Sequence, residues 1–204
     1  MRTQTPFCLR FCTSARTWNS PPVRTSGLTN TTLPGNVSRC PWARVTTTST
    51  GRLFDTAAAI AGFTREMSFE GQAAMWLQHL AHECEEAGAH PFPFTGEELD
   101  FRPLLATMLR DRLRGRPCAE IARAFHRGVA TGISQAVLQL AGTLAIDTVV
   151  FSGGVFQNEL LLRDIHALLS EARLTVWVNH AVPPNDGGIS LGQAALGAFG
   201  RFDR

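Results

Sequence analysis

The chain has 204 residues, nineteen arginines, no lysine and a formal net charge of +2 at pH 7. A charge this close to zero gives no electrostatic footprint for nucleic acid, and no stretch approaches the run of about eighteen apolar residues that spans a membrane. Of the five cysteines, three lie within the first 40 residues, while Cys84 and Cys118 stand alone. We therefore expect a cytoplasmic protein with no nucleic-acid or membrane partner.

The first 50 residues differ in composition from the rest. They hold six arginines, seventeen serines or threonines and no acidic residue, whereas the remainder holds thirteen arginines against seventeen acids. Such a segment buries too little apolar surface to offset its chain entropy, so we predict that residues 1–45 are disordered or poorly ordered. An organellar transit peptide also fits this composition, but we favour an anomalous start, such as a wrongly assigned initiation site or a frameshift.

About 150 residues remain, which is enough for one compact domain. Apolar periodicity predicts helices, in chain order, over residues 53–61, 71–87, 101–114, 118–144, 158–171 and 188–199. Strands are predicted over residues 147–152 and 174–178. Because a helix separates them, the two strands should pair in parallel through a right-handed crossover. The sequence thus predicts an α/β fold, rich in helix, with a short parallel sheet.

The segment VVFSGGVFQN, residues 149–158, runs from a β-branched strand through a glycine pair to a helix start at about Gln157. Gly153 and Gly154 lack a Cβ, so the backbone can adopt positive φ and approach a ligand closely. Their amides and the helix N-terminus would then face an anion. The pattern indicates a phosphate site, with an ordinary tight turn as the alternative.

A second sharp turn follows the second strand, where Asn185 and Asp186 stand between a proline pair and a glycine pair. This composition predicts that the last helix starts at about Gly188. The Asp186 carboxylate is either an N-cap for that helix or a metal ligand aimed into a cleft. The residues alone favour the cap.

Four runs occur in a characteristic order: STGRLFD (49–55), FEGQAA (69–74), SGGVFQN (152–158) and PPNDGGISLGQ (183–193). Together they resemble the C-terminal part of the HypF family, the carbamoyltransferases that mature NiFe hydrogenases. The resemblance covers about residues 46–199, so we expect a HypF-type region over 46–204. It implies the C-terminal lobe of an actin and Hsp70-like ATPase fold (ASKHA), incomplete in this chain, with nucleotide in a cleft between two lobes.

The resemblance implies nucleotide contacts at five positions: Asp55, Gly71, Gly153, Gly154 and Asn158. The structural alternatives are an acid in a first helical turn for Asp55, a flexible helix start for Gly71, and a plain N-cap for Asn158. The resemblance also makes Asp186 a metal ligand beside the γ-phosphate of ATP, for a divalent ion or iron, with zinc or iron typical of the family. No residue is assigned a catalytic role.

The histidines carry less information. His79 and His82 lie four residues before Glu83 and Glu86, a spacing more typical of a solvated, charge-paired helix face than of a metal site. His126 lies in an amphipathic helix, where we expect a packed, hydrogen-bonded imidazole.

In the family, carbamoyl phosphate and ATP give carbamoyl adenylate, and the carbamoyl group passes to the C-terminal cysteine of a HypE-type acceptor. The chain has no His-x-x-x-His pair, the family's metal motif in the N-terminal lobe, so we expect no transfer activity from the chain alone. The alternatives are a relative of the tRNA threonylcarbamoyl transferases, or a catalytically inactive nucleotide-binding remnant.

Overall fold

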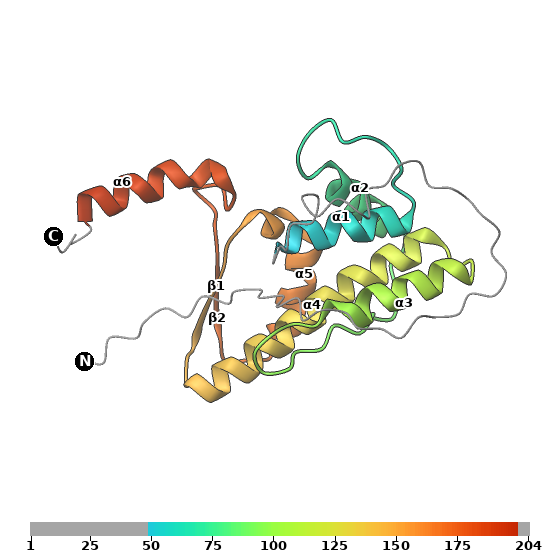
Figure 1. The fold of residues 1–204 in the computed structure, drawn as a ribbon. Coiled ribbons are helices and arrows are strands. Elements are labelled where there is room, and N and C mark those ends of the chain that lie inside the picture. The colour runs from blue at the N-terminus through green and yellow to red at the C-terminus, as the bar shows by residue number, and fades with distance from the viewer. Residues whose placement is uncertain (1–48, 200–204) are drawn as a thin grey trace, which may run out of the picture. The chain divides into compact units, whose positions relative to one another are not determined.

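The structure is a computed structural model that describes residues 49–199, so the prediction for residues 1–45 lies outside the described range. Its helices are α1 (Thr50–Ala61), α2 (Gln72–His82), α3 (Phe101–Leu113), α4 (Cys118–Leu144), α5 (Glu159–Leu169) and α6 (Ile189–Phe199) (Figure 1). The strands are β1 (Thr148–Phe151) and β2 (Thr175–Val178), and two 3-10 turns are η3 (Gly154–Gln157) and η4 (Asp186–Gly188). The predicted α/β fold, rich in helix with a short parallel sheet, is confirmed.

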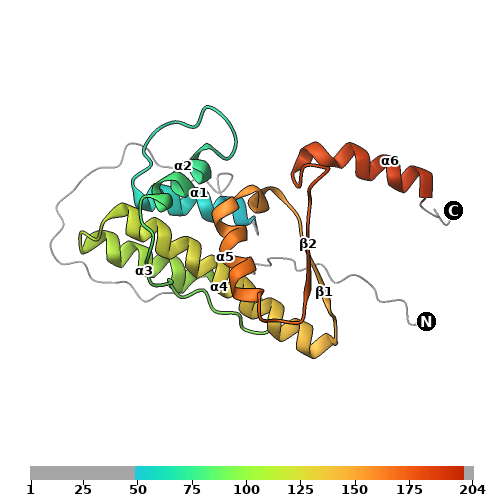
Figure 2. The same cartoon turned by 180° about the vertical axis from the view of Figure 1, so that it is seen from behind.

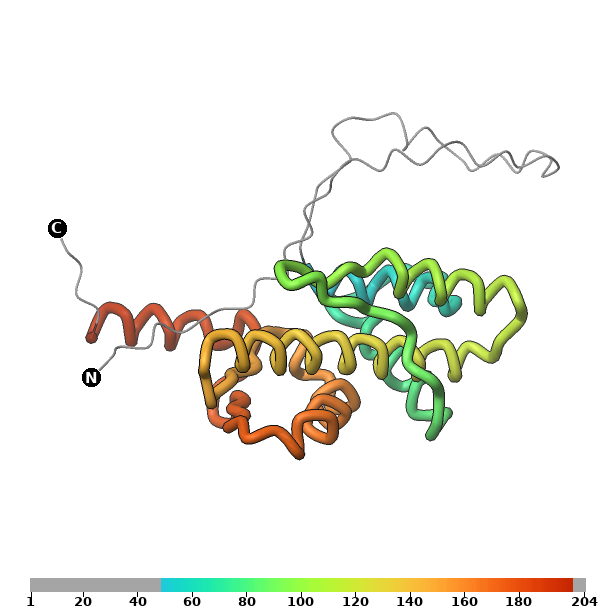
Figure 3. The backbone as a smooth tube through the Cα atoms, turned by 90° about the horizontal axis from the view of Figure 1, so that it is seen from below, coloured from blue at the N-terminus to red at the C-terminus, as the bar shows by residue number. Residues whose placement is uncertain are grey.

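The long helix α4 is the centre of the packed core. Most of its middle is buried, and the exposed residues Arg127 and Gln135 mark one narrow stripe that faces solvent. Helices α1, α2, α3 and α5 all pack against it. Figure 2 shows α5 beside α4, and Figure 3 shows α3 and α4 running along each other. Each surrounding helix inserts a fully buried side chain: Phe54, Leu77, Leu104 and Leu160, and each such burial contributes about 1.5–3 kcal/mol.

The segment between α2 and α3 crosses α4 at very close range. The amide of His90 donates a hydrogen bond to the carbonyl of Ala124. A Cβ added at Gly128 would lie 2.4 Å from the His90 carbonyl oxygen, and one added at Gly132 would lie 2.4 Å from that of Phe92. Because the two glycines are one helical turn apart, they present a smooth groove for this crossing segment.

The sheet consists of β1 and β2 in parallel, with Thr148 opposite Thr175 and Phe151 opposite Val178. Side chains alternate between its two faces. On the outer face, Val150 and Trp177 are 62% and 61% exposed. Helix α6 likewise buries none of its residues. None of the helices between residues 49 and 199 has the length and apolar character needed to cross a bilayer.

The largest boundary error concerns α2, which ends at His82 rather than at residue 87. A local turn replaces the last predicted helical turn: the amide of Glu83 bonds to the carbonyl of Leu80, and the thiol of Cys84 bonds to the carbonyl of Glu86. His82 and Glu86 therefore do not share a helix face, and the charge pairing predicted between them is wrong. In contrast, α4 has the predicted bounds.

Candidate functional site

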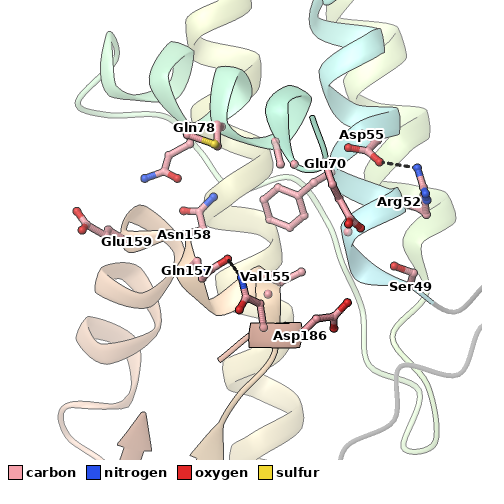
Figure 4. Close-up of a pocket in the computed structure, with 17 residues that line it drawn as sticks. Ser49, Arg52, Asp55, Glu70, Gln78, Val155, Gln157, Asn158, Glu159 and Asp186 are labelled. Atoms are coloured by element: carbon pink, nitrogen blue, oxygen red, sulfur yellow. Dashed lines mark hydrogen bonds and ion pairs between the residues drawn. The ribbon is translucent and has the colours of Figure 1, made fainter. Parts of the chain in front are cut away.

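A cavity of about 840 Å³ opens between α1, the start of α2 and the two 3-10 turns (Figure 4). Its volume lies in the range of small-molecule pockets, about 300–1,000 Å³. Five residues predicted to bind nucleotide or metal line it: Asp55, Gly71, Gly154, Asn158 and Asp186. The sixth, Gly153, is not among the lining residues. Three turns that are far apart in the sequence therefore meet at one cavity.

The two glycines after β1 have different conformations. Gly153 has φ 111° and ψ 158°, a region open essentially to glycine alone, whereas Gly154 has no positive φ. A Cβ added at Gly154 would make only an ordinary 3.7 Å contact with the Cβ of Asn185. The expectation that both glycines serve positive φ is thus corrected: Gly153 bends the chain, and Gly154 lines the cavity. Since η3 intervenes, α5 starts at Glu159 rather than at Gln157.

Asn158 is the N-cap of α5 and is only 8% exposed. Its Oδ1 accepts a hydrogen bond of 2.9 Å from the amide of Leu161, which is N-cap geometry. Its Nδ2 lies 3.1 Å from Nε2 of His126, and Nδ1 of that ring lies 2.8 Å from the carbonyl oxygen of Ala122. The predicted packed, hydrogen-bonded His126 is confirmed, and burial lowers the pKa of this imidazole to about 4.

The N-cap of η4, the turn that leads into α6, is Asn185 and not Asp186. Oδ1 of Asn185 accepts a 3.1 Å bond from the amide of Gly187, and its Nδ2 donates to Oε1 of Gln157 at 3.3 Å. The second bond joins η4 to η3, as Figure 4 shows. Among the described residues, no hydrogen bond or ion pair engages the Asp186 carboxylate, which lines the cavity. The N-cap interpretation of Asp186 is therefore wrong.

The opposite wall presents Asp55 and Gly71. Helix α1 begins at Thr50, which places Asp55 beyond the first turn, so the macrodipole interpretation of its carboxylate is wrong. Asp55 pairs instead with Arg52 at 3.2 Å. Gly71 is the N-cap of α2 at φ 84°, and a Cβ added there would meet nothing within 4 Å. A left-handed glycine thus opens this wall of the cavity.

The cavity is rich in negative charge. Its lining contains one guanidinium, that of Arg52, and four carboxylates, those of Asp55, Glu70, Glu159 and Asp186. Reasoning from sequence missed Glu70, Glu159 and Arg52, although the two glutamates directly adjoin Gly71 and Asn158. An anionic ligand in this cavity would be repelled unless a cation accompanied it.

Two polar clusters lie among the helices outside the lining of the cavity. Arg123 of α4 pairs with Asp164 of α5, with Nη2 and Oδ1 at 2.9 Å. In the second cluster, Nε2 of His90 lies 2.9 Å from Oδ2 of Asp111, which Arg116 also contacts at 2.7 Å. Burial lowers the pKa of His90, against the opposing effect of Asp111. No sequence signal marked His90. Residues 49–199 contain no group of three or more His, Cys, Asp or Glu side chains that could hold a metal.

The helices packed around α4, the short parallel sheet and the cavity beside the turns that follow its strands are consistent with a lobe of the actin and Hsp70-like class. A family model described as "Carbamoyltransferase, Kae1-like Domain, second subdomain" matches residues 30–193. HypF of Rhizobium leguminosarum bv. viciae is 38% identical over 152 residues, which are 73% of this chain and 19% of that protein. The chain belongs to the HypF carbamoyltransferase family.

Two solved structures support this assignment. HypF of T. kodakarensis superposes with a TM-score of 0.67 at 29% identity, covering 73% of this chain and 19% of that one. Full-length HypF in the phosphate- and nucleotide-bound form gives a TM-score of 0.64 at 38% identity, over 73% of this chain and 20% of that one. The chain thus spans about a fifth of the length of these relatives. The family match begins at residue 30, upstream of the start expected near residue 46.

Proposed function

We propose that the cavity binds ATP and that this chain provides one wall of the nucleotide site of a HypF-type carbamoyltransferase. The observation that carries the proposal is the meeting of the Gly71, Gly154–Asn158 and Asn185–Asp186 turns at one cavity of nucleotide size. A relative that is 38% identical was solved in a phosphate- and nucleotide-bound form. The threonylcarbamoyl transferase alternative is not favoured, because the matched relatives are HypF proteins.

In this proposal, each wall contacts a different part of the nucleotide. Backbone amides of the η3 turn and the start of α5 face the phosphates, where the helix dipole favours negative charge. The Asp55 carboxylate, on α1, accepts hydrogen bonds from ribose hydroxyls. Gly153 acts indirectly, because its backbone conformation sets the course of η3. Asn158 also acts mainly through structure, since both ends of its amide already have partners inside the protein.

The Asp186 carboxylate would hold the metal. Its cap role is taken by Asn185, and it lies at the cavity without a protein partner among the described residues. A single carboxylate suits Mg²⁺, which is usually held by one or two carboxylates together with substrate phosphates and waters; zinc or iron would need further ligands. The metal would supply charge neutralisation and Lewis acidity at a phosphoryl or carbamoyl oxygen.

The reaction we propose is ATP-dependent carbamoyl transfer from carbamoyl phosphate to a cysteine of a HypE-type acceptor during hydrogenase maturation. Its support is the family itself, whose matched members are named carbamoyltransferases. We also propose a cytoplasmic location, which the free thiols of Cys84 and Cys118 support.

Calorimetric titration of the full chain with ATP, with and without Mg²⁺, tests the nucleotide site. We expect saturable binding with Mg²⁺, weakened about tenfold or more without it, because the lining of the cavity holds four carboxylates and one guanidinium. Absence of ATP binding at millimolar nucleotide with Mg²⁺ would contradict the proposal.

A further inference from the structure

A continuous series of hydrogen bonds joins α4 to the start of α5 through His126 and Asn158, and Asn158 lines the cavity. The series begins at the Ala122 carbonyl on α4, 2.8 Å from Nδ1 of His126, and ends at the Leu161 amide on α5, 2.9 Å from Oδ1 of Asn158. Nε2 of His126 and Nδ2 of Asn158 meet between them at 3.1 Å. The side chain of His126 is fully buried.

The backbone groups at the two ends fix the direction of every bond. The Leu161 amide can only donate, so Oδ1 of Asn158 faces it and Nδ2 faces the ring. The Ala122 carbonyl can only accept, so Nδ1 of His126 carries the proton. Nε2 is then left with a lone pair, which accepts from Nδ2 of Asn158. The Asn158 amide is thereby held in one orientation, and the His126 ring in one tautomer.

The same imidazole also touches the other wall of the cavity. Its ring packs edge-on against Phe54 of α1, with centroids 5.5 Å apart, and Phe54 lines the cavity next to Asp55. His126, which lies on α4, therefore contacts one side chain from each wall: Phe54 of α1 and Asn158 at the start of α5.

We propose that His126, as the neutral Nδ1–H tautomer, is a positioning residue for the nucleotide site. By accepting from Asn158 it holds the N-cap of α5, and with it the η3 turn, at the geometry the cavity requires. This inference rests on the proposed function, because nucleotide binding is what the held geometry is proposed to serve.

Two substitutions separate positioning from packing. His126→Gln can place a carbonyl oxygen near the position of Nε2 and keep an acceptor for Asn158. His126→Asn can keep a donor near the position of Nδ1 for the Ala122 carbonyl, but it is too short to reach Asn158. Both remove the aromatic ring, so both should lower the melting temperature, and a role in packing alone predicts that they behave alike.

Amide hydrogen exchange over residues 154–161 is the readout that needs no nucleotide. We expect the Asn variant to exchange about five- to tenfold faster than the Gln variant there, with no difference between the two in α3. ATP affinity should fall in the same order. Equal exchange and equal affinity in the two variants would overturn the proposal.

A third variant, Asn158→Asp, keeps both the imidazole and a good N-cap but replaces the donor facing Nε2 by a carboxylate oxygen. Nitrogen-15 spectra of the histidine ring should show the neutral Nδ1–H tautomer in the wild-type chain at neutral pH, and a protonated ring in this variant. A wild-type ring protonated on Nε2 would overturn the proposal, even if the other variants fail to fold. If the wild-type chain binds no ATP, the proposed function fails, and exchange and ring spectra still decide whether His126 orients Asn158.

Discussion

Asp186 and Asn185 are adjacent residues with different roles, and the difference depends on which side chain bonds to the Gly187 amide. Asn185 makes that bond, so the Asp186 carboxylate is not needed for the turn. The same reasoning makes Asn158 structural first, because its Oδ1 caps α5 and its Nδ2 meets His126. At this scale, the hydrogen-bond partners decide which predicted ligands can act directly on a nucleotide.

Asp186→Asn should leave the fold intact and weaken Mg²⁺-dependent ATP binding. Since Asn185 supplies the cap, the free energy of unfolding should change by less than about 0.5 kcal/mol. The affinity for ATP with Mg²⁺ should drop about tenfold or more, because the one carboxylate proposed to hold the cation is lost. The matched control is Glu171→Gln, an exposed acid after the far end of α5. Equal ATP affinity in the two variants would remove Asp186 from the site.

Acid should destabilise the fold through its buried imidazoles. Burial lowers the pKa of His126 from 6.5 to about 4 and also lowers that of His90. The unfolded chain takes up these protons near pH 6.5, while the folded chain does not, so stability is fully present above pH 6.5 and falls as the pH drops toward about 4. For His126 the loss amounts to ~3 kcal/mol.

Urea unfolding at about pH 7.5 and about pH 4.5 measures this loss. His126→Phe should flatten the pH dependence, whereas His79→Gln, an exposed histidine on α2, should retain it. A free energy of unfolding that stays constant between these two pH values would contradict the assignment of neutral, buried imidazoles.

At the scale of elements, the segment of residues 83–100, which joins α2 to α3, packs closely against α4. This packing depends on Gly128 and Gly132, where the backbone carbonyls of His90 and Phe92 approach closely. Those carbonyls belong to backbone and cannot rotate away as a flexible side chain would. The close approach therefore leaves no room for a methyl group at either glycine.

Gly128→Ala and Gly132→Ala should each destabilise the protein by about 1–3 kcal/mol through overpacking. Gly142 lies on the same helix with nothing within 4 Å of an added Cβ. Gly142→Ala should therefore stabilise by about 0.5–1 kcal/mol, as expected for alanine in a helix. Thermal or urea unfolding shows whether each substitution lowers or raises the stability of the protein. A stabilising Gly128→Ala would mean that the crossing segment does not lie against α4 as described.

Periodicity was sufficient to predict α4, the parallel pairing of β1 with β2 and the helix between them, because these depend on apolar spacing along one stretch of chain. It failed at the end of α2, where the bonds of Glu83 and Cys84 compete with a further helical turn. The Gly153 and Gly154 pair signalled a turn, but only the structure shows which glycine has positive φ. His90 gave no signal, because its partner Asp111 lies on another element.

At the scale of the whole molecule, α4 connects the separate parts of the described chain. The crossing segment contacts α4 through Gly128 and Gly132, α5 joins it through Arg123 and Asp164, and the cavity lies where α1, α2 and the two turns meet. The central claim is that this cavity is where ATP binds. The turns that line it are widely separated in the sequence, so a response to nucleotide at all of them would locate the ligand.

Proton–nitrogen NMR spectra of the full chain, recorded as ATP and Mg²⁺ are added, test that claim most directly. We predict saturable shifts in the amides of Asp55, Gly71, Gly154, Asn158 and Asp186, which line the cavity. The amides of α3, which contributes no lining residue, should stay unchanged. Shifts confined to other elements, or no shifts at saturating nucleotide, would contradict the proposed site.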